Sequence, residues 1–239
     1  MLRVEGWVTD LPSQPNALSG SLSAGQVACV LGRNGAGKSW LLRSWVGLQS
    51  AIAGQFHGPD SSKRAQWLGY LAQTEDRMFP MQVLDYVLSA RTPWLAWHQD
   101  YRAEDRQIAE AALSQVGLAD YRDRSIQSLS GGEWQRVRLA ALVAGQSKVW
   151  LLDEPTEHLD PGHIWNTLPG LIREHTTAGG AVIMVAHDPD WAAQLSDQCV
   201  LLSSDSWSWG SAEDQLTQAN LSQLYGHPYE CRDGRWLAV

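Results

Sequence analysis

The chain has 239 residues, of which 44% are hydrophobic and 18% charged, enough for one large domain or two small ones. Its formal net charge of −8 argues against a partner held mainly through phosphates, so we expect no nucleic acid partner. No apolar run reaches about 18 residues, which predicts no membrane span. Three widely spaced cysteines without a CxxC pair indicate a reducing, cytoplasmic setting.

The first third of the chain reads as short strands joined by turns. Residues 2–8, 26–31 and 68–71 are alternating or continuous apolar runs, as half-buried and buried strands require. A helix is predicted to begin near Gly37, and its apolar face consists of Leu41, Leu42 and Trp45.

The middle of the chain changes to helical periodicity. Within 74–128, apolar residues recur at three- and four-residue spacing, which predicts a helical insert. After the insert, 149–153 and 181–185 are predicted to be buried strands, with a helix after Pro161 between them. Strands that alternate with helices predict a parallel sheet covered on both faces, so we expect an α/β core with a helical insert.

A glycine-rich loop joins the predicted strand 26–31 to the helix that follows it. It matches the pattern G-x-x-x-x-G-K-[ST] with Gly32, Arg33, Asn34, Gly35, Ala36, Gly37, Lys38 and Ser39. Glycines let successive backbone N–H groups turn toward phosphate oxygens, and the start of a helix adds its positive dipole end. We therefore expect a nucleoside triphosphate here, with Lys38 on the β- and γ-phosphates and the Ser39 hydroxyl on Mg²⁺.

A second glycine pair, Gly131 and Gly132, stands between Ser130 and Glu133 where another helix is predicted to begin. Ser130 as N-cap and Glu133 three residues later would form a capping box. That box does not need two glycines, each of which costs about 1 kcal/mol in a helix interior. Bare backbone N–H groups at a helix start can bind an anion, so Ser130, Gly131 and Gly132 are predicted ligand contacts.

With this second motif the sequence resembles the ABC ATPases over essentially its whole length, because their signature is LSGGQ or LSGGE and 129–133 reads LSGGE. The resemblance implies a P-loop NTPase core of the RecA-like type, with an N-terminal antiparallel β subdomain and an inserted helical subdomain. It implies a single ABC ATPase domain, 1–239. The nucleotide-binding core would comprise 1–73 and 136–239, and the helical subdomain 74–135.

The other family motifs follow in order, and the resemblance assigns a role to each. Asp153 would hold Mg²⁺, and Glu154 would polarise the water that attacks ATP. Gln73 would contact Mg²⁺ and the helical insert, and His187 would contact the γ-phosphate. Asp160, in the D-loop, would cross to a partner subunit.

The resemblance also implies partners and a location. Two copies would face each other head to tail, with ATP between Lys38 and Ser39 of one copy and Ser130, Gly131 and Gly132 of the other. Transmembrane permease subunits and a periplasmic binding protein would complete the assembly. The chain would then lie peripherally on the cytoplasmic face of the inner membrane.

Four segments resemble the ATPases of metal-chelate importers, which carry iron–siderophore complexes, haem or vitamin B12. These segments are 79–83, 90–94, 129–141 and 221–226. An exporter ATPase stays open, because motor motifs do not report the direction of transport. A DNA-repair ATPase would need a long coiled coil that the chain does not have room for between Ser39 and the LSGGE motif.

Two further alternatives are disfavoured. Ribosome-acting ABC ATPases usually carry two cassettes in one chain, and this chain has one. A binding module without hydrolysis does not fit the intact Lys38, Asp153, Glu154 and His187. A metal site made by His158, Asp160 and His163 is not expected, because the D-loop accounts for the aspartate.

Two positions depart from the family pattern. Trp40 stands where a threonine usually follows Ser39, so we expect a changed α-phosphate contact through the backbone N–H that remains. The family usually stacks adenine on an aromatic residue near the start of the chain, and the aligned place falls near Leu11. No tyrosine or phenylalanine is nearby, and the closest aromatic, Trp7, reads as a strand residue.

Overall fold

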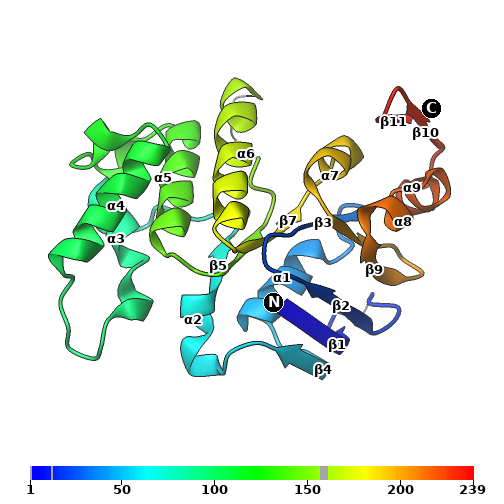
Figure 1. The fold of residues 1–239 in the computed structure, drawn as a ribbon, viewed down its shortest axis with the longest axis horizontal. Helices are drawn as coiled ribbons and strands as arrows, with labels where there is room; N and C mark the ends of the chain where they lie inside the picture. The colour runs from blue at the N-terminus through cyan, green and yellow to red at the C-terminus, as the bar shows by residue number, and fades with distance from the viewer. Residues whose placement is uncertain (1, 12, 157–160) are drawn as a thin grey trace.

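The computed structural model describes residues 2–11, 13–156 and 161–239, with the backbone alone for 161–166. Within this part of the chain, a six-stranded sheet has the order β5-β6-β7-β3-β8-β9 (Figure 1). The first five of these strands run parallel, and β9 pairs antiparallel with β8. The strands are β3 (Val27–Gly32), β5 (Leu68–Leu71), β6 (Val149–Leu152), β7 (Ala181–Val185), β8 (Gln198–Leu202) and β9 (Trp207–Ser211). The predicted strands at 26–31, 68–71, 149–153 and 181–185 are thus confirmed.

The carboxyl ends of the parallel strands meet at one edge of the sheet, and the predicted motifs follow them there. The glycine-rich loop follows β3, Gln73 follows β5, Asp153 and Glu154 follow β6, and His187 follows β7. β3 lies between β7 and β8, where the strand order reverses. Ligands of open parallel sheets bind at such a point, outside the carboxyl ends of the strands.

One face of the sheet packs against a helix and a small antiparallel sheet. The helix is α1 (Lys38–Val46), and the small sheet consists of β1 (Leu2–Thr9), β2 (Leu18–Leu22) and β4 (Ala51–His57) in the order β2-β1-β4. Leu41, Leu42 and Trp45 are fully buried on α1, which confirms the predicted apolar face. Each such side chain contributes about 1.5–3 kcal/mol to folding, so this packing fixes the helix that follows the glycine-rich loop.

The opposite face packs against helices of the second half of the chain. Leu171 on α6 (Pro161–Thr177) and Trp191 on α7 (Pro189–Leu195) belong to the same buried cluster as Cys29, Trp150 and Met184 on the strands. The sheet is therefore covered on both faces, as the alternation of strands and helices predicted.

Three helices lie together to one side of the sheet (Figure 1). They are α3 (Val83–Ser89), α4 (Ala103–Gln115) and α5 (Gly131–Ala144), with short 3₁₀ turns at Thr92–Trp94, Ala119–Tyr121 and Ile126–Ser128. The helical insert predicted within 74–128 is present. The predicted subdomain boundary after residue 135 falls inside α5, and the placement of that boundary stays a prediction.

The remaining elements are short. They are the 3₁₀ turn Ser61–Lys63, α2 (Arg64–Trp67), α8 (Ala212–Gln215), α9 (Gln218–Tyr225) and the hairpin of β10 (Tyr229–Arg232) and β11 (Arg235–Ala238). Among the helices of the described residues, none is both long enough and apolar enough to cross a membrane.

Candidate functional site

A hollow of about 620 Å³ opens at the carboxyl edge of the sheet. It is lined by Leu11, Asn34, Gly35, Gly37, Lys38, Ser39, Trp40, Arg43, Gln73, Glu154, Thr156 and His187. The structure therefore brings the glycine-rich loop together with residues that follow β1, β5, β6 and β7. Its volume is that of a typical small-molecule site.

The glycine-rich loop needs glycine at two of its positions for backbone reasons. Gly35 and Gly37 have φ of 80° and 95°, in the left-handed region that other residues rarely adopt. A Cβ on Gly37 would also lie 2.3 Å from Cδ2 of Leu11. The loop thus bends sharply into α1, and the N-terminal end of that helix points into the hollow.

Lys38 lies across this loop. Its Nζ donates hydrogen bonds to the carbonyl oxygens of Gly32 and Arg33, at 2.9 and 3.1 Å. Burial lowers the pKa of Lys38, while the charges of Glu154 and Asp153 oppose that shift. The ammonium is therefore held at the centre of the loop, close to two carboxylates.

Ser39, in the first turn of α1, and Asp153, directly after β6, lie side by side. The Ser39 hydroxyl donates to Oδ1 of Asp153 at 2.8 Å, and the Tyr70 hydroxyl donates to Oδ2 at 3.2 Å. Asp153 is fully buried, and burial raises the pKa of its carboxyl. A buried carboxylate beside a hydroxyl is an oxygen-rich pair, of the kind that hard divalent cations prefer.

Glu154 is held between two other predicted residues. Its Oε2 accepts a hydrogen bond from Nε2 of Gln73 at 3.0 Å, and its Oε1 lies 2.7 Å from Nε2 of His187. The backbone of Glu154 has φ of 51°, a strained conformation for a residue with a side chain. Gln73, Glu154 and His187, which the sequence places far apart, thus form one connected group.

Comparison with known proteins places this constellation in a family. Residues 15–157 match the ABC transporter family model. The haemin import ATP-binding protein HmuV of Pseudomonas entomophila is 37% identical over 86% of this chain and 84% of its own length. The vitamin B12 import ATP-binding protein BtuD of Salmonella heidelberg is 36% identical over 87% of this chain and 86% of its own.

The fold agrees with these relatives. A solved metal-chelate-type ABC transporter in an inward-facing conformation superposes with a TM-score of 0.86 and 26% identity, over 100% of this chain and 97% of that one.

The chain belongs to the ABC transporter ATP-binding proteins.

It is accordingly an ATPase with the fold that the resemblance implied. The LSGGE signature of this ABC protein opens α5 and does not line the hollow. The Ser130 hydroxyl accepts from the Glu133 N–H at 3.3 Å, and Oε2 of Glu133 accepts from the Ser130 N–H at 2.8 Å. The Ser130 N–H, with help from Tyr121, lowers the pKa of Glu133 to about 2. The capping box is therefore present, and Gly131 lies exposed at the start of the helix.

Asp160 of the predicted D-loop lies outside the described residues, as do His158 and the side chain of His163. Among the residues that the structure describes, no three His, Cys, Asp or Glu side chains cluster as a metal site would require.

The remaining part of the hollow departs from the family pattern. Leu11 lines it, so the place aligned with the family's aromatic residue does lie at the site. Trp7 is buried in β1, and its Nε1 donates to the Ser44 hydroxyl at 2.9 Å, so Trp7 is a strand residue as predicted. Trp40 lines the hollow, and its Nε1 donates to Oδ1 of Asp10 at 2.8 Å.

Three residues of this ABC ATPase site, Tyr70, Arg43 and Thr156, were not predicted from the sequence. Tyr70 bonds to Asp153, and burial raises the pKa of Tyr70 to about 12, so it stays a hydroxyl donor. Nε of Arg43 lies 3.4 Å from the Tyr70 hydroxyl. The pairing of β5 with β6 could have pointed to Tyr70, because it places Tyr70 opposite Leu151, two residues before Asp153.

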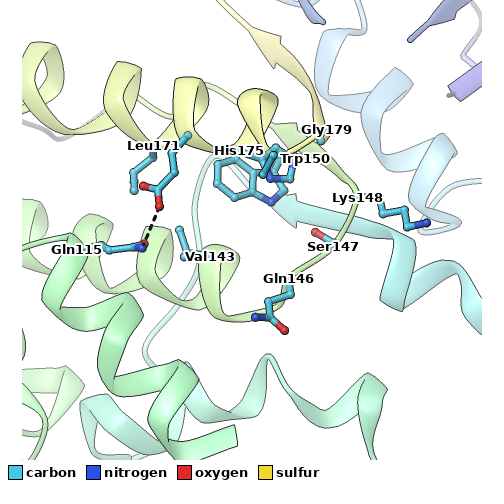
Figure 2. Close-up of a pocket in the computed structure, with 12 residues that line it drawn as sticks. Gln115, Val143, Gln146, Ser147, Lys148, Trp150, Leu171, His175 and Gly179 are labelled. Carbon is cyan, nitrogen blue, oxygen red and sulfur yellow. Dashed lines mark hydrogen bonds between the residues drawn. The ribbon is translucent and has the colours of Figure 1, made fainter. Parts of the chain in front are cut away.

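A second hollow, of about 590 Å³, lies between α5 and the end of α6 (Figure 2). Trp150 and His175 stack there with ring centroids 3.9 Å apart, and Gln115 donates to Glu174 at 3.4 Å. No residue of the glycine-rich loop lines it. The hollow at the carboxyl edge of the sheet, which the glycine-rich loop does line, is therefore the candidate nucleotide site of this ABC protein.

Proposed function

We propose that this chain is the ATP-hydrolysing subunit of an importer for a metal chelate such as an iron–siderophore complex, haem or vitamin B12. The observation that supports ATP hydrolysis most directly is that five side chains meet around one hollow: Lys38, Ser39, Asp153, Glu154 and His187. The named import roles of the relatives, which include a petrobactin import ATP-binding protein of Bacillus anthracis at 34% identity, support the cargo class over an exporter.

In the proposed reaction, a water oxygen bonds to the γ-phosphorus of ATP and the bond from that phosphorus to the β,γ-bridging oxygen breaks. Glu154 accepts the proton from the attacking water. Gln73 and His187 hold its carboxylate in place, which supports a positioned base. Lys38 neutralises the phosphate charge, and ADP and phosphate leave.

The oxygen atoms of Ser39 and Asp153 fit a magnesium ion. They already lie 2.8 Å apart, and the Asp153 carboxylate is fully buried, where a cation would stabilise its charge. Ser39 and Asp153 would hold Mg²⁺, with Gln73 nearby, and the ion would supply positive charge beside the β- and γ-phosphate oxygens.

A second copy of the chain would complete the site. Ser130, Gly131 and Gly132 lie at the N-terminus of a 14-residue helix and do not line the hollow of their own chain. The backbone N–H groups of Gly131 and Gly132 and the Ser130 hydroxyl would therefore reach a phosphate only across an interface, with Asp160 crossing in the other direction. We propose a head-to-tail homodimer with one ATP at each of two such junctions.

The permease would dock on the helical insert. We define the insert face as Phe79, Met81 and Trp94, with exposed fractions of 70%, 37% and 41%. Phe79 and Met81 precede α3 and Trp94 follows it, and contiguous exposed apolar patches mark interaction sites, so we propose that the three belong to one docking surface. A helix of a membrane permease is the proposed partner, with a periplasmic binding protein delivering cargo. The chain would then lie at the cytoplasmic face of the inner membrane.

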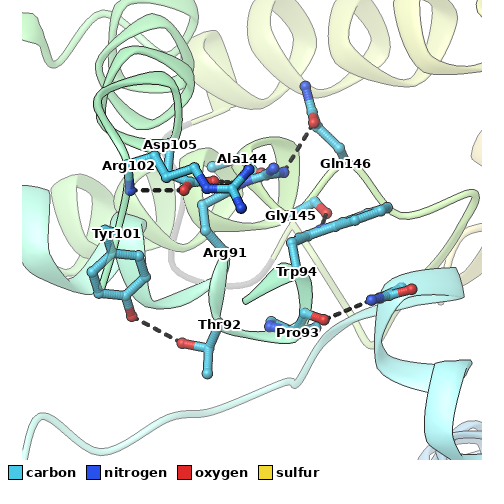
Figure 3. Close-up of polar contacts among 11 residues, drawn as sticks. Arg91, Thr92, Pro93, Trp94, Tyr101, Arg102, Asp105, Ala144, Gly145 and Gln146 are labelled. Carbon is cyan, nitrogen blue, oxygen red and sulfur yellow. Dashed lines mark hydrogen bonds and ion pairs between the residues drawn. The ribbon is translucent and has the colours of Figure 1, made fainter. Parts of the chain in front are cut away.

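A buried network holds one end of this face in place (Figure 3). Nε of Arg91 donates to Oδ1 of Asp105 at 3.0 Å, and NH1 of Arg91 donates to the carbonyl of Ala144 at 3.0 Å. The Trp94 indole N–H donates to the carbonyl of Gly145 at 2.8 Å. Because these bonds join the segment after α3 to α4 and to the end of α5, motion of the insert would carry Trp94 with it.

Reconstitution would test the proposed function. The chain is assembled in proteoliposomes with the permease encoded beside its gene, and ATP-driven uptake of haem, a ferric siderophore and cobalamin is measured. Uptake of one of these, absent in a matched preparation with Glu154→Gln, is the expected result. Assembly and ATP hydrolysis without uptake of any chelate would overturn the cargo class. Export of a substrate would overturn the direction.

A further inference from the structure

The hollow has two distinguishable ends. Glu154 and His187 mark the end where the γ-phosphate would react, and Lys38 marks the middle of the phosphate chain. An extended nucleotide that begins there must place its base away from Glu154. On that side lie Leu11, against Gly37 of the loop, and Trp40 in the first turn of α1.

Trp40 is suited to contact a flat ring at that end. Of the described residues that line the hollow, it carries the one large aromatic ring, and it is half-buried. Its Nε1 is engaged by Asp10, which follows β1, so the edge of the indole is tethered while α1 fixes its backbone. Two neighbouring tryptophans are buried: Trp7, which donates to Ser44, and Trp207, whose ring would lie 3.3 Å from a Cβ on Gly37.

We propose that Trp40 is the residue on which the nucleotide base stacks, with Asp10 as a positioning residue that holds the indole. An indole fixed at its edge presents a π-face without losing further side-chain freedom when the base arrives. Base–aromatic stacking is worth about 1–3 kcal/mol per base in nucleic-acid complexes. Trp40 thus acts through its side chain as well as through the backbone N–H beside the α-phosphate. This inference rests on the proposed placement of the nucleotide in this hollow.

The test separates the base from the phosphates. Calorimetry on the isolated subunit compares Mg·ATP with inorganic tripolyphosphate, which lacks the base and ribose. We expect Trp40→Ala to weaken ATP binding about tenfold, within the range that stacking supplies, and to leave tripolyphosphate binding within about twofold. Trp40→Phe should recover most of the loss. Asp10→Ala should weaken ATP binding less, and only when Trp40 is present.

Trp97→Ala is the matched control. Trp97 is 88% exposed in the insert, does not line the hollow, and should leave both affinities unchanged. Equal losses for ATP and tripolyphosphate in Trp40→Ala and in Trp40→Phe would overturn stacking and indicate a role in the packing of α1. Unchanged ATP binding in Trp40→Ala would overturn it as well.

Lys38→Ala distinguishes failure of this inference from failure of the proposed site. If Lys38→Ala loses both ligands while Trp40→Ala binds as wild type, the site stands and the base stacks elsewhere. If Lys38→Ala binds both ligands normally, the nucleotide does not lie in this hollow, and the inference falls with it.

Discussion

The nucleotide hollow and the insert face use their side chains in opposite ways. In the hollow, polar side chains bond to one another: Ser39 to Asp153, and both Gln73 and His187 to Glu154. On the insert face, Phe79 and Trp94 expose apolar surface to solvent. Chemistry needs a charge arrangement fixed in advance, whereas docking needs apolar area that is buried only in a complex.

The comparison also shows where each region obtains its rigidity. The hollow takes its geometry from strand ends and from one strained residue, Glu154, with φ of 51°. The insert face depends on a buried ion pair, Arg91 with Asp105, beneath its exposed ring. Changes in the hollow should therefore alter ATP turnover without affecting permease assembly, and changes on the face should do the reverse.

The largest expected effect is on turnover in Glu154→Gln. The amide keeps the shape of the side chain but is a poor proton acceptor, so we expect ATPase activity to fall by about 10²–10⁴-fold with ATP binding retained. Steady-state phosphate release and calorimetry measure the two quantities. Gel filtration with ATP should also show the dimer accumulating. Turnover at the wild-type rate would remove Glu154 from the base role.

A second large effect is expected on affinity in Lys38→Ala. The ammonium neutralises phosphate charge that is already present in the ground state, so its loss should weaken ATP binding by about 2 kcal/mol or more, about 30-fold. Thermal melting without nucleotide checks that the loop still folds. This variant and Glu154→Gln together separate binding from catalysis, and an unchanged affinity would contradict the assignment of Lys38.

The hollow was largely predictable from sequence because its parts lie at strand ends in a fixed order. The carboxyl ends of parallel strands share an edge, so Lys38, Asp153 and His187 had to meet once their strands were recognised. The contact of Tyr70 with Asp153 was not predicted, since it depends on which strands are neighbours and on side-chain direction across β5 and β6.

The indole of Trp40 was not predicted to point at Asp10 for a similar reason. Their contact joins α1 to the end of β1, and no local pattern reports such a tertiary contact. The same holds for Arg91, whose buried partners come from α4 and the end of α5. The sequence predicted the elements and their motifs, whereas these contacts depend on how the elements pack.

A smaller effect, confined to assembly, is expected for Met81→Glu on the insert face. A carboxylate buried at the interface without a partner should weaken permease docking by about 1–3 kcal/mol. The basal ATPase of the isolated subunit should be unchanged, because Met81 does not line the hollow. Pull-down with the permease and an ATPase assay on the free subunit measure the two outcomes.

Ile52→Glu is the matched control for that variant. Ile52 lies on β4 and is 69% exposed, so it receives the same charge on an apolar surface outside the insert. Equal loss of pull-down in both variants would show a general effect of added negative charge. Normal assembly and transport by Met81→Glu would show that the insert face is not the docking surface.

The smallest effect is expected for Leu11→Tyr, and it sharpens the comparison within the hollow itself. Leu11 lies against Gly37 at the base end, so a ring placed there could stack on the base from a second direction. If Trp40 already stacks on the base, the added ring contributes little, and ATP affinity should rise by about threefold or less.

In the Trp40→Ala background, Leu11→Tyr should restore a larger part of the lost ATP affinity, because the base then has no other ring to stack on. Calorimetry on the four proteins of this cycle measures the coupling between the two positions. Equal gains from Leu11→Tyr in both backgrounds would mean that the two side chains act independently, so that a ring at position 11 does not compete with Trp40 for the base.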